Sequence, residues 1–347
     1  MKYSRKLLLG ILASFGMLLL ILDSRTALKG ASEGVLLSIY TVVPSLFPFL
    51  FLSIFLSGTL SGIPLSFLRP LGKLCGIREG SEGIILAGLL GGYPAGAHSV
   101  YQAYKQEQIT KNEAQRMLGF CNNAGPAFLF GMLSRCFSSL FLILILWLIH
   151  IVSAILTGIL LPGKTRERCL PDSPSTISTS QALEKSIHAI LSVCGWIILF
   201  RVIIQFISSW FLWLFPGEWQ VLIIGSLELA NGCVSLIAIK NEAIRFLLAG
   251  LLLSFGGVCV LMQTSSAVGE LGIRKYLLGK LIQTGLSLFL GLLLLPFLFP
   301  GSIGLTTVIY GSVAFAIIAV SLFVCRTKKV VAFKWNMLYD NKNITQR

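Results

Sequence analysis

The sequence predicts an all-α polytopic membrane protein with about 8 to 10 hydrophobic segments, in two similar halves that contain re-entrant or broken helices. Of its 347 residues, 55% are hydrophobic and only 12% are charged, which excludes an ordinary soluble domain. Long apolar stretches recur along the chain, and several approach the roughly 20 residues that a bilayer-spanning helix needs. Glycine, proline and asparagine interrupt some of these stretches.

The apolar stretches follow one another along nearly the whole chain. They run over residues 7–22, 34–57, 83–103, 118–133, 137–161, 187–215, 219–239, 244–266, 276–299 and 303–325. The first follows three basic residues, as the core of a cleaved signal peptide would, but no small-x-small cleavage site precedes Asp23. We therefore expect an uncleaved first helix whose N-terminus is cytoplasmic.

Basic residues gather at the N-terminus and at residues 69–78, 164–168 and 326–329. Lys and Arg concentrate in the short cytoplasmic loops of membrane proteins, so these clusters explain the net charge of +14 without nucleic-acid binding. The lipid bilayer is the expected partner.

The number of apolar stretches between these clusters is odd. Three lie between 69–78 and 164–168, and five lie between 164–168 and 326–329. An odd number of crossings cannot return the chain to the same side, so at least one stretch in each half should be re-entrant or broken. The stretches with internal glycine, proline or asparagine are 83–103, 118–133, 219–239 and 244–266.

We expect the chain to be organised around a polar linker. The regions are an N-terminal helix and loop at 1–33, a first half at 34–162, a cytoplasmic linker at 163–183, a second half at 184–300, and a last helix with a basic tail at 301–347. Ala-Gly-Leu-Leu occurs in both halves, at 87–90 and 249–252, each time followed by a Gly-Gly pair. Internal repeats of this kind build many secondary transporters, although leucine-rich sequence also yields chance matches.

The string from Gly91 to Ala97, Gly-Gly-Tyr-Pro-Ala-Gly-Ala, lies inside an apolar stretch. Its glycines relax the backbone and Pro94 removes a helical hydrogen bond, which would leave amide and carbonyl groups free for a ligand. Irregular backbone at membrane depth is tolerated only where protein buries it or where it lines a cavity. The alternative is a kinked helix that packs through small residues.

Asn122 and Asn123 lie in the next apolar stretch, followed by Gly125 and Pro126. Carboxamides are costly in an apolar environment unless they are hydrogen-bonded, and they offer donors and acceptors that suit a carboxylate, a ring nitrogen or an ion. The alternative is that they cap a half-helix.

In the second half, Glu228 and Asn231 lie in the middle of an apolar stretch. An acidic residue at that depth could couple a proton or a sodium ion, or it could simply neutralise Arg201. If the substrate is an anion, Arg201 is the fixed cation best suited to bind it.

Two further features interrupt apolar segments. Gly256 and Gly257 form a second glycine break, with Gln263 about two helical turns further on. Pro44 and Pro48 mark the stretch 34–57 as bent or discontinuous. The candidate substrate-binding residues that these motifs supply are Gly92, Tyr93, Pro94, Gly96, Asn122, Asn123, Gly125, Pro126, Arg201, Glu228, Asn231, Gly256, Gly257 and Gln263.

The sequence favours neither an enzyme nor a metal or cofactor site. The eight cysteines contain no Cys-x-x-Cys pair and are typical of small buried hydrophobes. The three histidines, His98, His150 and His188, are far apart in the sequence, and His98 and His150 are more typical of an interface or a cavity than of a catalytic site. The one crude nucleophile and base arrangement joins His98 to Ser99 or Cys121. We therefore expect no cofactor and no catalytic residue.

Five motifs, in this order and spacing, resemble one family. They lie at 43–49, 92–97, 109–114, 122–126 and 228–232, and the pair Gly-Tyr-Pro-x-Gly-Ala and Asn-Asn-x-Gly-Pro is the specific part. The chain resembles the YlbJ-type sporulation integral membrane proteins, which belong with the nucleoside-recognition or Gate-domain membrane proteins.

The resemblance implies a protein of the outer forespore membrane, made in the mother cell, that moves dipicolinic acid toward the developing spore. It also implies inverted repeats with helical hairpins. Two alternatives stay open, a non-transporting scaffold for spore-envelope (cortex) assembly and a nucleoside-type transporter. The expected ligand is a small anion, and the coupling ion and a homo-oligomeric state are left open.

Overall fold

The computed structural model describes residues 2–60, 63–161 and 177–301, and these residues are helical, with no strand among them. The chain divides into two compact units, Met1–Ser287 and Leu288–Arg347, and of the second unit only residues 288–301 are described. All the stretches that the sequence predicts to be broken belong to the first unit. The predicted last helix and basic tail, and most of the predicted linker, lie outside the described residues.

Five helical runs in the described residues are long and apolar enough to cross a membrane. They are Ser24–Thr59, Leu140–Leu160, Thr179–Trp210, Glu242–Leu271 and Arg274–Leu298. The prediction of an all-α membrane protein is confirmed.

The N-terminal region is more helical than the sequence predicts. Helix α1 (Lys2–Leu22) is followed directly by α2 (Ser24–Leu37), because Asp23 caps α2 by accepting a hydrogen bond from the Thr26 amide at 3.2 Å. The expected loop before residue 33 is therefore wrong.

The two prolines of the next stretch do not break the helix. A π-helical turn at Ser38–Val42 leads into α3 (Val43–Thr59), which begins around Pro44 and contains Pro48. The wider turn accommodates a proline without ending the helix. The predicted discontinuity is thus reduced to a local change in helical winding.

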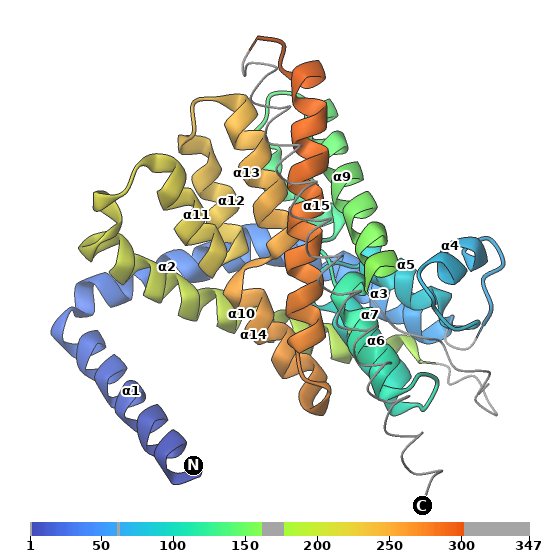
Figure 1. Ribbon diagram of the computed structural model, residues 1–347. Coiled ribbons are helices and arrows are strands. Elements are labelled where there is room, and N and C mark those ends of the chain that lie inside the picture. Colours follow the sequence, from blue (N-terminus) through green and yellow to red (C-terminus); the bar gives the residue numbers. More distant parts are fainter. Residues whose placement is uncertain (1, 61–62, 162–176, 302–347) are drawn as a thin grey trace, which may run out of the picture. The chain divides into compact units, whose positions relative to one another are not determined.

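Helix α2 packs closely along α10 (Thr179–Trp210), and the two lie side by side in Figure 1. Gly30 and Gly34 face α10, where a Cβ atom on Gly30 would lie 2.9 Å from the Val202 backbone. This is the small-xxx-small geometry of membrane helix pairs. An ion pair between Glu33 and Arg201 joins the same two helices.

The first two glycine- and asparagine-containing stretches are both interrupted. One consists of α5 (Glu82–Leu90) and α6 (Ala95–Lys105), and the other of α7 (Lys111–Cys121) and α8 (Pro126–Leu133). A short helix, α4 (Arg69–Leu74), precedes them, and the uninterrupted α9 (Leu140–Leu160) follows.

The two corresponding stretches of the second half are interrupted as well. One consists of α11 (Gly217–Leu227) and α12 (Leu229–Ser235), and the other of α13 (Glu242–Phe255) and α14 (Gly257–Val268). Short 3₁₀ turns follow α10, α12 and α14, at Leu212–Leu214, Leu236–Ala238 and Gly269–Leu271, and α15 (Arg274–Leu298) is continuous. All four stretches that the sequence predicts to be broken contain a break.

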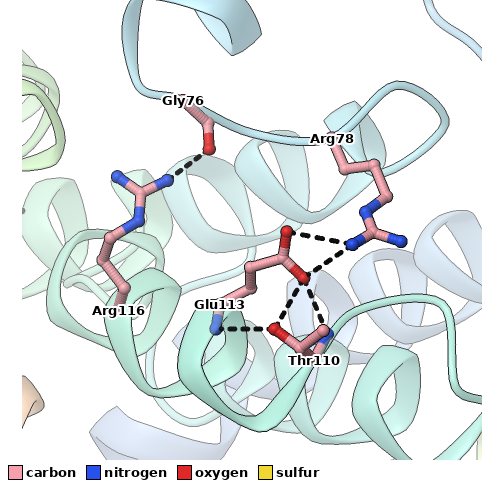
Figure 2. A network of polar contacts seen from close by, with 5 residues as sticks. All are labelled: Gly76, Arg78, Thr110, Glu113 and Arg116. Carbon is pink, nitrogen blue, oxygen red and sulfur yellow. Dashed lines mark hydrogen bonds and ion pairs between the residues drawn. The ribbon is translucent and has the colours of Figure 1, made fainter. Parts of the chain in front are cut away.

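A buried polar network attaches the loop before α5 to the start of α7 (Figure 2). The Glu113 carboxylate accepts hydrogen bonds from the Thr110 amide and hydroxyl, at 2.7 and 2.8 Å, and forms an ion pair with Arg78 at 3.1 Å. Arg116, one turn further along α7, donates to the carbonyls of Gly76 and Gly158. The network fixes where the first interrupted stretches begin.

We expect Glu113→Gln to destabilise the protein, because it leaves the Arg78 guanidinium buried without a counter-charge. Removing one partner of a buried ion pair costs about 3–5 kcal/mol. Thermal unfolding of detergent-purified protein should give a clearly lower apparent Tm. Glu218→Gln is the control, since Glu218 is exposed and has no ion pair among the described residues. Equal Tm values for the two variants would contradict this account of the network.

Candidate functional site

The helix breaks in α5–α8 and in α11–α14 meet each other. Gly92 has a φ of +76° and lies against Gly125, so that a Cβ atom on Gly92 would be 2.9 Å from the Gly125 nitrogen. Gly256 has a φ of +81°, and a Cβ atom there would be 3.0 Å from the Tyr93 hydroxyl oxygen. The Gly92–Pro94 break therefore contacts both the break before α8 and the break before α14.

The fourth break joins the same cluster through Gly257. With a φ of +83°, Gly257 packs on the last turn of α11, where a Cβ atom would be 2.9 Å from the Gly225 carbonyl oxygen. Only glycine combines these left-handed backbone angles with such close approach. All four breaks thus form one contiguous region of the first unit.

Asn122 joins α6 to α14 across this region. Its side-chain oxygen accepts a hydrogen bond from the Ala97 amide at 3.2 Å, and its nitrogen donates to the Thr264 hydroxyl on α14 at 2.9 Å. The Ala95 amide donates to the Gly92 carbonyl at 2.8 Å. The expectation that the amides at this break are free for a ligand is therefore wrong for Ala95 and Ala97, because the fold itself satisfies them.

Asn123 contacts a residue that sequence reasoning missed. Its side-chain oxygen accepts a hydrogen bond from Lys280 Nζ at 3.0 Å, while its nitrogen donates to the Phe120 carbonyl at 2.7 Å. Lys280 is fully buried, donates to Gln283 Oε1 at 2.8 Å, and lies over the rings of Tyr93 and Tyr276. Lys280 and Gln283 are three residues apart on α15, and this helical spacing was the available sequence signal.

A cavity of about 320 Å³ lies beside the breaks, at the lower end of the range for small-molecule sites. Its walls come from α3, α5, α6, α10 and α14. The charged or titratable groups that line it are His98, Lys185 and His188, and none of the described lining residues is acidic. Lys185 lies close enough to His98 to act on it electrostatically. The lining therefore favours an anion.

Most of this lining was not among the predicted site residues. Of those, Pro94 and Gln263 line the cavity, and Gln263 also lines a smaller cavity of about 30 Å³ together with Tyr93, Gly125 and Glu228. Lys185, His188 and Ser192 repeat at intervals of three and four residues on α10, which places them on one helix face. This helical spacing was the sequence signal that these three residues of α10 could form one wall of the cavity.

Glu228 and Arg201 do not form a pair with each other. The Glu228 carboxylate caps α12, accepting hydrogen bonds from the Ala230 amide at 2.9 Å and the Asn231 amide at 2.7 Å, and from the Asn231 side chain at 2.6 Å. Arg201 pairs with Glu33, because the glycine contacts bring α2 close to α10 at that level. Arg201 therefore forms its ion pair with Glu33 rather than with Glu228, although it lies close enough to Glu228 to act on it electrostatically.

The other predicted site residues have packing roles in the structure. A Cβ atom on Gly96 would collide with the Cys121 carbonyl, and Pro126 begins α8 at a position that suits proline. Among the described residues, six cysteines are unpaired and no group of three or more His, Cys, Asp or Glu side chains could hold a metal ion.

The apolar helices, their converging breaks and the polar cavity define an integral membrane protein of the polytopic α-helical class. The chain is similar to the sporulation integral membrane protein YlbJ of Bacillus subtilis (strain 168), with 25% identity over 264 residues. The match covers 62% of this chain and 64% of YlbJ, which is less than two thirds of the relative's length. The resemblance to YlbJ-type proteins is confirmed. No family model matches the chain, and no solved structure matches it.

We expect Gly92→Ala to destabilise the protein, because the new methyl group meets the Gly125 backbone and the φ of +76° disfavours any side chain. A strained left-handed residue alone costs about 1–3 kcal/mol. The matched control is Gly195→Ala on α10, where nothing lies within 4 Å of the added atom. The apparent Tm in detergent should fall for Gly92→Ala and stay level or rise for Gly195→Ala. Unchanged stability of Gly92→Ala would contradict the close approach of the two breaks.

Proposed function

We propose that the protein moves a small anionic solute across its membrane, with the cavity of His98, Lys185 and His188 as the binding site. The observation that carries the proposal is the charge of this cavity, which is exclusively basic among the described lining residues, beside four helix breaks. Charged and titratable groups inside a membrane protein face cavities and pathways rather than lipid. A basic cavity therefore fits an anion better than a cation or a neutral solute.

The breaks supply the means for alternating access. In the proposed cycle α6 and α14 move relative to α3 and α10, because the cavity walls come from these four helices and α5. The interruptions at Gly92 and Gly256 let the half-helices α6 and α14 move without distorting α5 and α13. Transporters with discontinuous helices use this arrangement around a fixed central site.

The proposal extends to the two-halves organisation of the sequence, with about 8 to 10 membrane segments and the cytoplasmic linker between the halves. Each half contributes two interrupted stretches, α5–α6 and α7–α8 in the first and α11–α12 and α13–α14 in the second. On this view the breaks are re-entrant elements, as the positions of the basic clusters require.

Dipicolinate, a pyridine dicarboxylate, is the proposed solute. Its two carboxylates match the Lys185 ammonium and imidazole N–H donors, and its ring nitrogen can accept a hydrogen bond from a side chain such as Gln263. The proposed location is the outer forespore membrane. Support for both comes from the family resemblance, and the similarity to YlbJ, a sporulation integral membrane protein, agrees with it.

Two rival functions make different predictions in the same assay. A nucleoside-type transporter should carry uridine and ignore dipicolinate, and a scaffold for spore-envelope assembly should carry neither. The protein is proposed not to be an enzyme. Uptake of radiolabelled dipicolinate and uridine into proteoliposomes separates these functions.

We expect Lys185→Met to lower dipicolinate uptake at limiting concentration. A charge-assisted hydrogen bond contributes about 1.5–3 kcal/mol, which corresponds to about 10- to 100-fold weaker binding. The control is Lys240→Met, because Lys240 is exposed and lies outside the cavity lining. If Lys185→Met takes up dipicolinate as well as the wild type does, the cavity is not part of the transport pathway. Failure of the wild-type protein to carry either dipicolinate or uridine would favour the scaffold.

We expect Asn123→Leu to abolish passage of the solute while the protein still inserts into the membrane. Leucine removes not only the acceptor of Lys280 Nζ but also the donor to the Phe120 carbonyl, which holds the break between α7 and α8 in place. The measurement is the dipicolinate content of spores in a strain that depends on this protein, with membrane-fraction immunoblots for insertion. Asn112→Leu, on the exposed start of α7, is the control. A normal dipicolinate content in Asn123→Leu spores would contradict this role of Asn123.

A further inference from the structure

The Lys280 amine is buried among neutral groups in the part of the chain that the structure describes. Its side chain is fully buried, and its two hydrogen-bond acceptors, Asn123 Oδ1 and Gln283 Oε1, are neutral amides. No carboxylate forms an ion pair with it among the described residues. Buried charges are normally paired, so a charged Lys280 would destabilise this fold. The burial of Lys280 is therefore better explained by a function than by stability.

The titratable groups around Lys280 cannot supply the missing negative charge at neutral pH. Tyr93 faces it from the break before α6, Cys121 from the end of α7, His150 from α9, and Tyr276 from its own helix. The tyrosine rings attract an ammonium, but this attraction is weaker than the loss of hydration on burial. An imidazolium at His150 would oppose the ammonium. These surroundings therefore stabilise the charged form of Lys280 only when an anion is near.

Tyr93 connects Lys280 to the cavities. Its ring lies 5.2 Å from Lys280 Nζ, and it lines the smaller cavity of about 30 Å³. Gln263 lines this smaller cavity and also the larger one of about 320 Å³. An anion in the cavities would therefore approach Lys280 from the side of Tyr93.

We infer that Lys280 binds a proton together with the anion, which makes the protein a proton–anion symporter. As the anion enters, the Lys280 amine takes up one proton that comes from water and becomes an ammonium, and it gives that proton back to water when the anion leaves. No other bond forms or breaks, and the proton gradient is the only additional reactant. This inference rests on the proposed transport function and names its coupling ion and residue.

The test uses the full chain in proteoliposomes, with radiolabelled dipicolinate as the probe and the membrane potential clamped at zero by a potassium ionophore. With an acidic exterior, one proton per anion should give about tenfold accumulation for each pH unit of the gradient. Lys280→Met should still exchange dipicolinate across the membrane but should accumulate none. Lys240→Met, on the exposed surface, should behave like the wild type.

A second readout covers the case in which Lys280→Met does not fold. With the wild-type protein alone, a pH-sensitive dye inside the vesicles should report acidification when dipicolinate enters without a pre-formed gradient. Dipicolinate uptake without acidification or response to the gradient would overturn the coupling, but not the transport function. A folded Lys280→Met protein that accumulates like the wild type would overturn the role of Lys280. No uptake under any condition would instead overturn the transport function.

Discussion

The hydrogen bond between Lys280 and Asn123 joins the continuous helix α15 to the break between α7 and α8, and the site depends on it. The Lys280 amine is fully buried and donates to two neutral acceptors, so hydrogen bonds rather than an ion pair hold it in place among the described residues. Tyr93 completes its surroundings from the break before α6. The breaks between α5 and α6 and between α7 and α8 thus both contact one side chain of α15.

Close approach of glycines and space for a ligand are two consequences of the same breaks. On one side Gly92 meets Gly125 and Gly256 meets Tyr93, which leaves no room for side chains. On the other side the half-helix α6 turns Pro94, His98 and Ser99 toward the cavity. Contacts that a continuous helix could not make therefore position a basic wall where a solute can reach it.

The positions of the breaks could be predicted from the sequence, because glycine, proline and asparagine act locally on the backbone. The interaction partners of the polar groups could not be predicted from the sequence. Arg201 pairs with Glu33 because Gly30 and Gly34 bring α2 against α10, and no local pattern near Arg201 encodes that packing. Lys185 and Lys280 stand at the margins of apolar stretches, where basic residues usually face water, so their positions in the cavity wall and in the core depend on the tertiary fold.

The central claim is that the basic cavity binds a small anion, and ligand-dependent thermal stability tests it most directly. A ligand that binds only the native state raises stability by about 2.7 kcal/mol at a concentration 100 times its Kd. We predict that dipicolinate raises the apparent Tm of the detergent-purified protein, that uridine does not, and that Lys185→Met weakens the response. An unchanged Tm with dipicolinate, or an equal rise with uridine, would contradict the account.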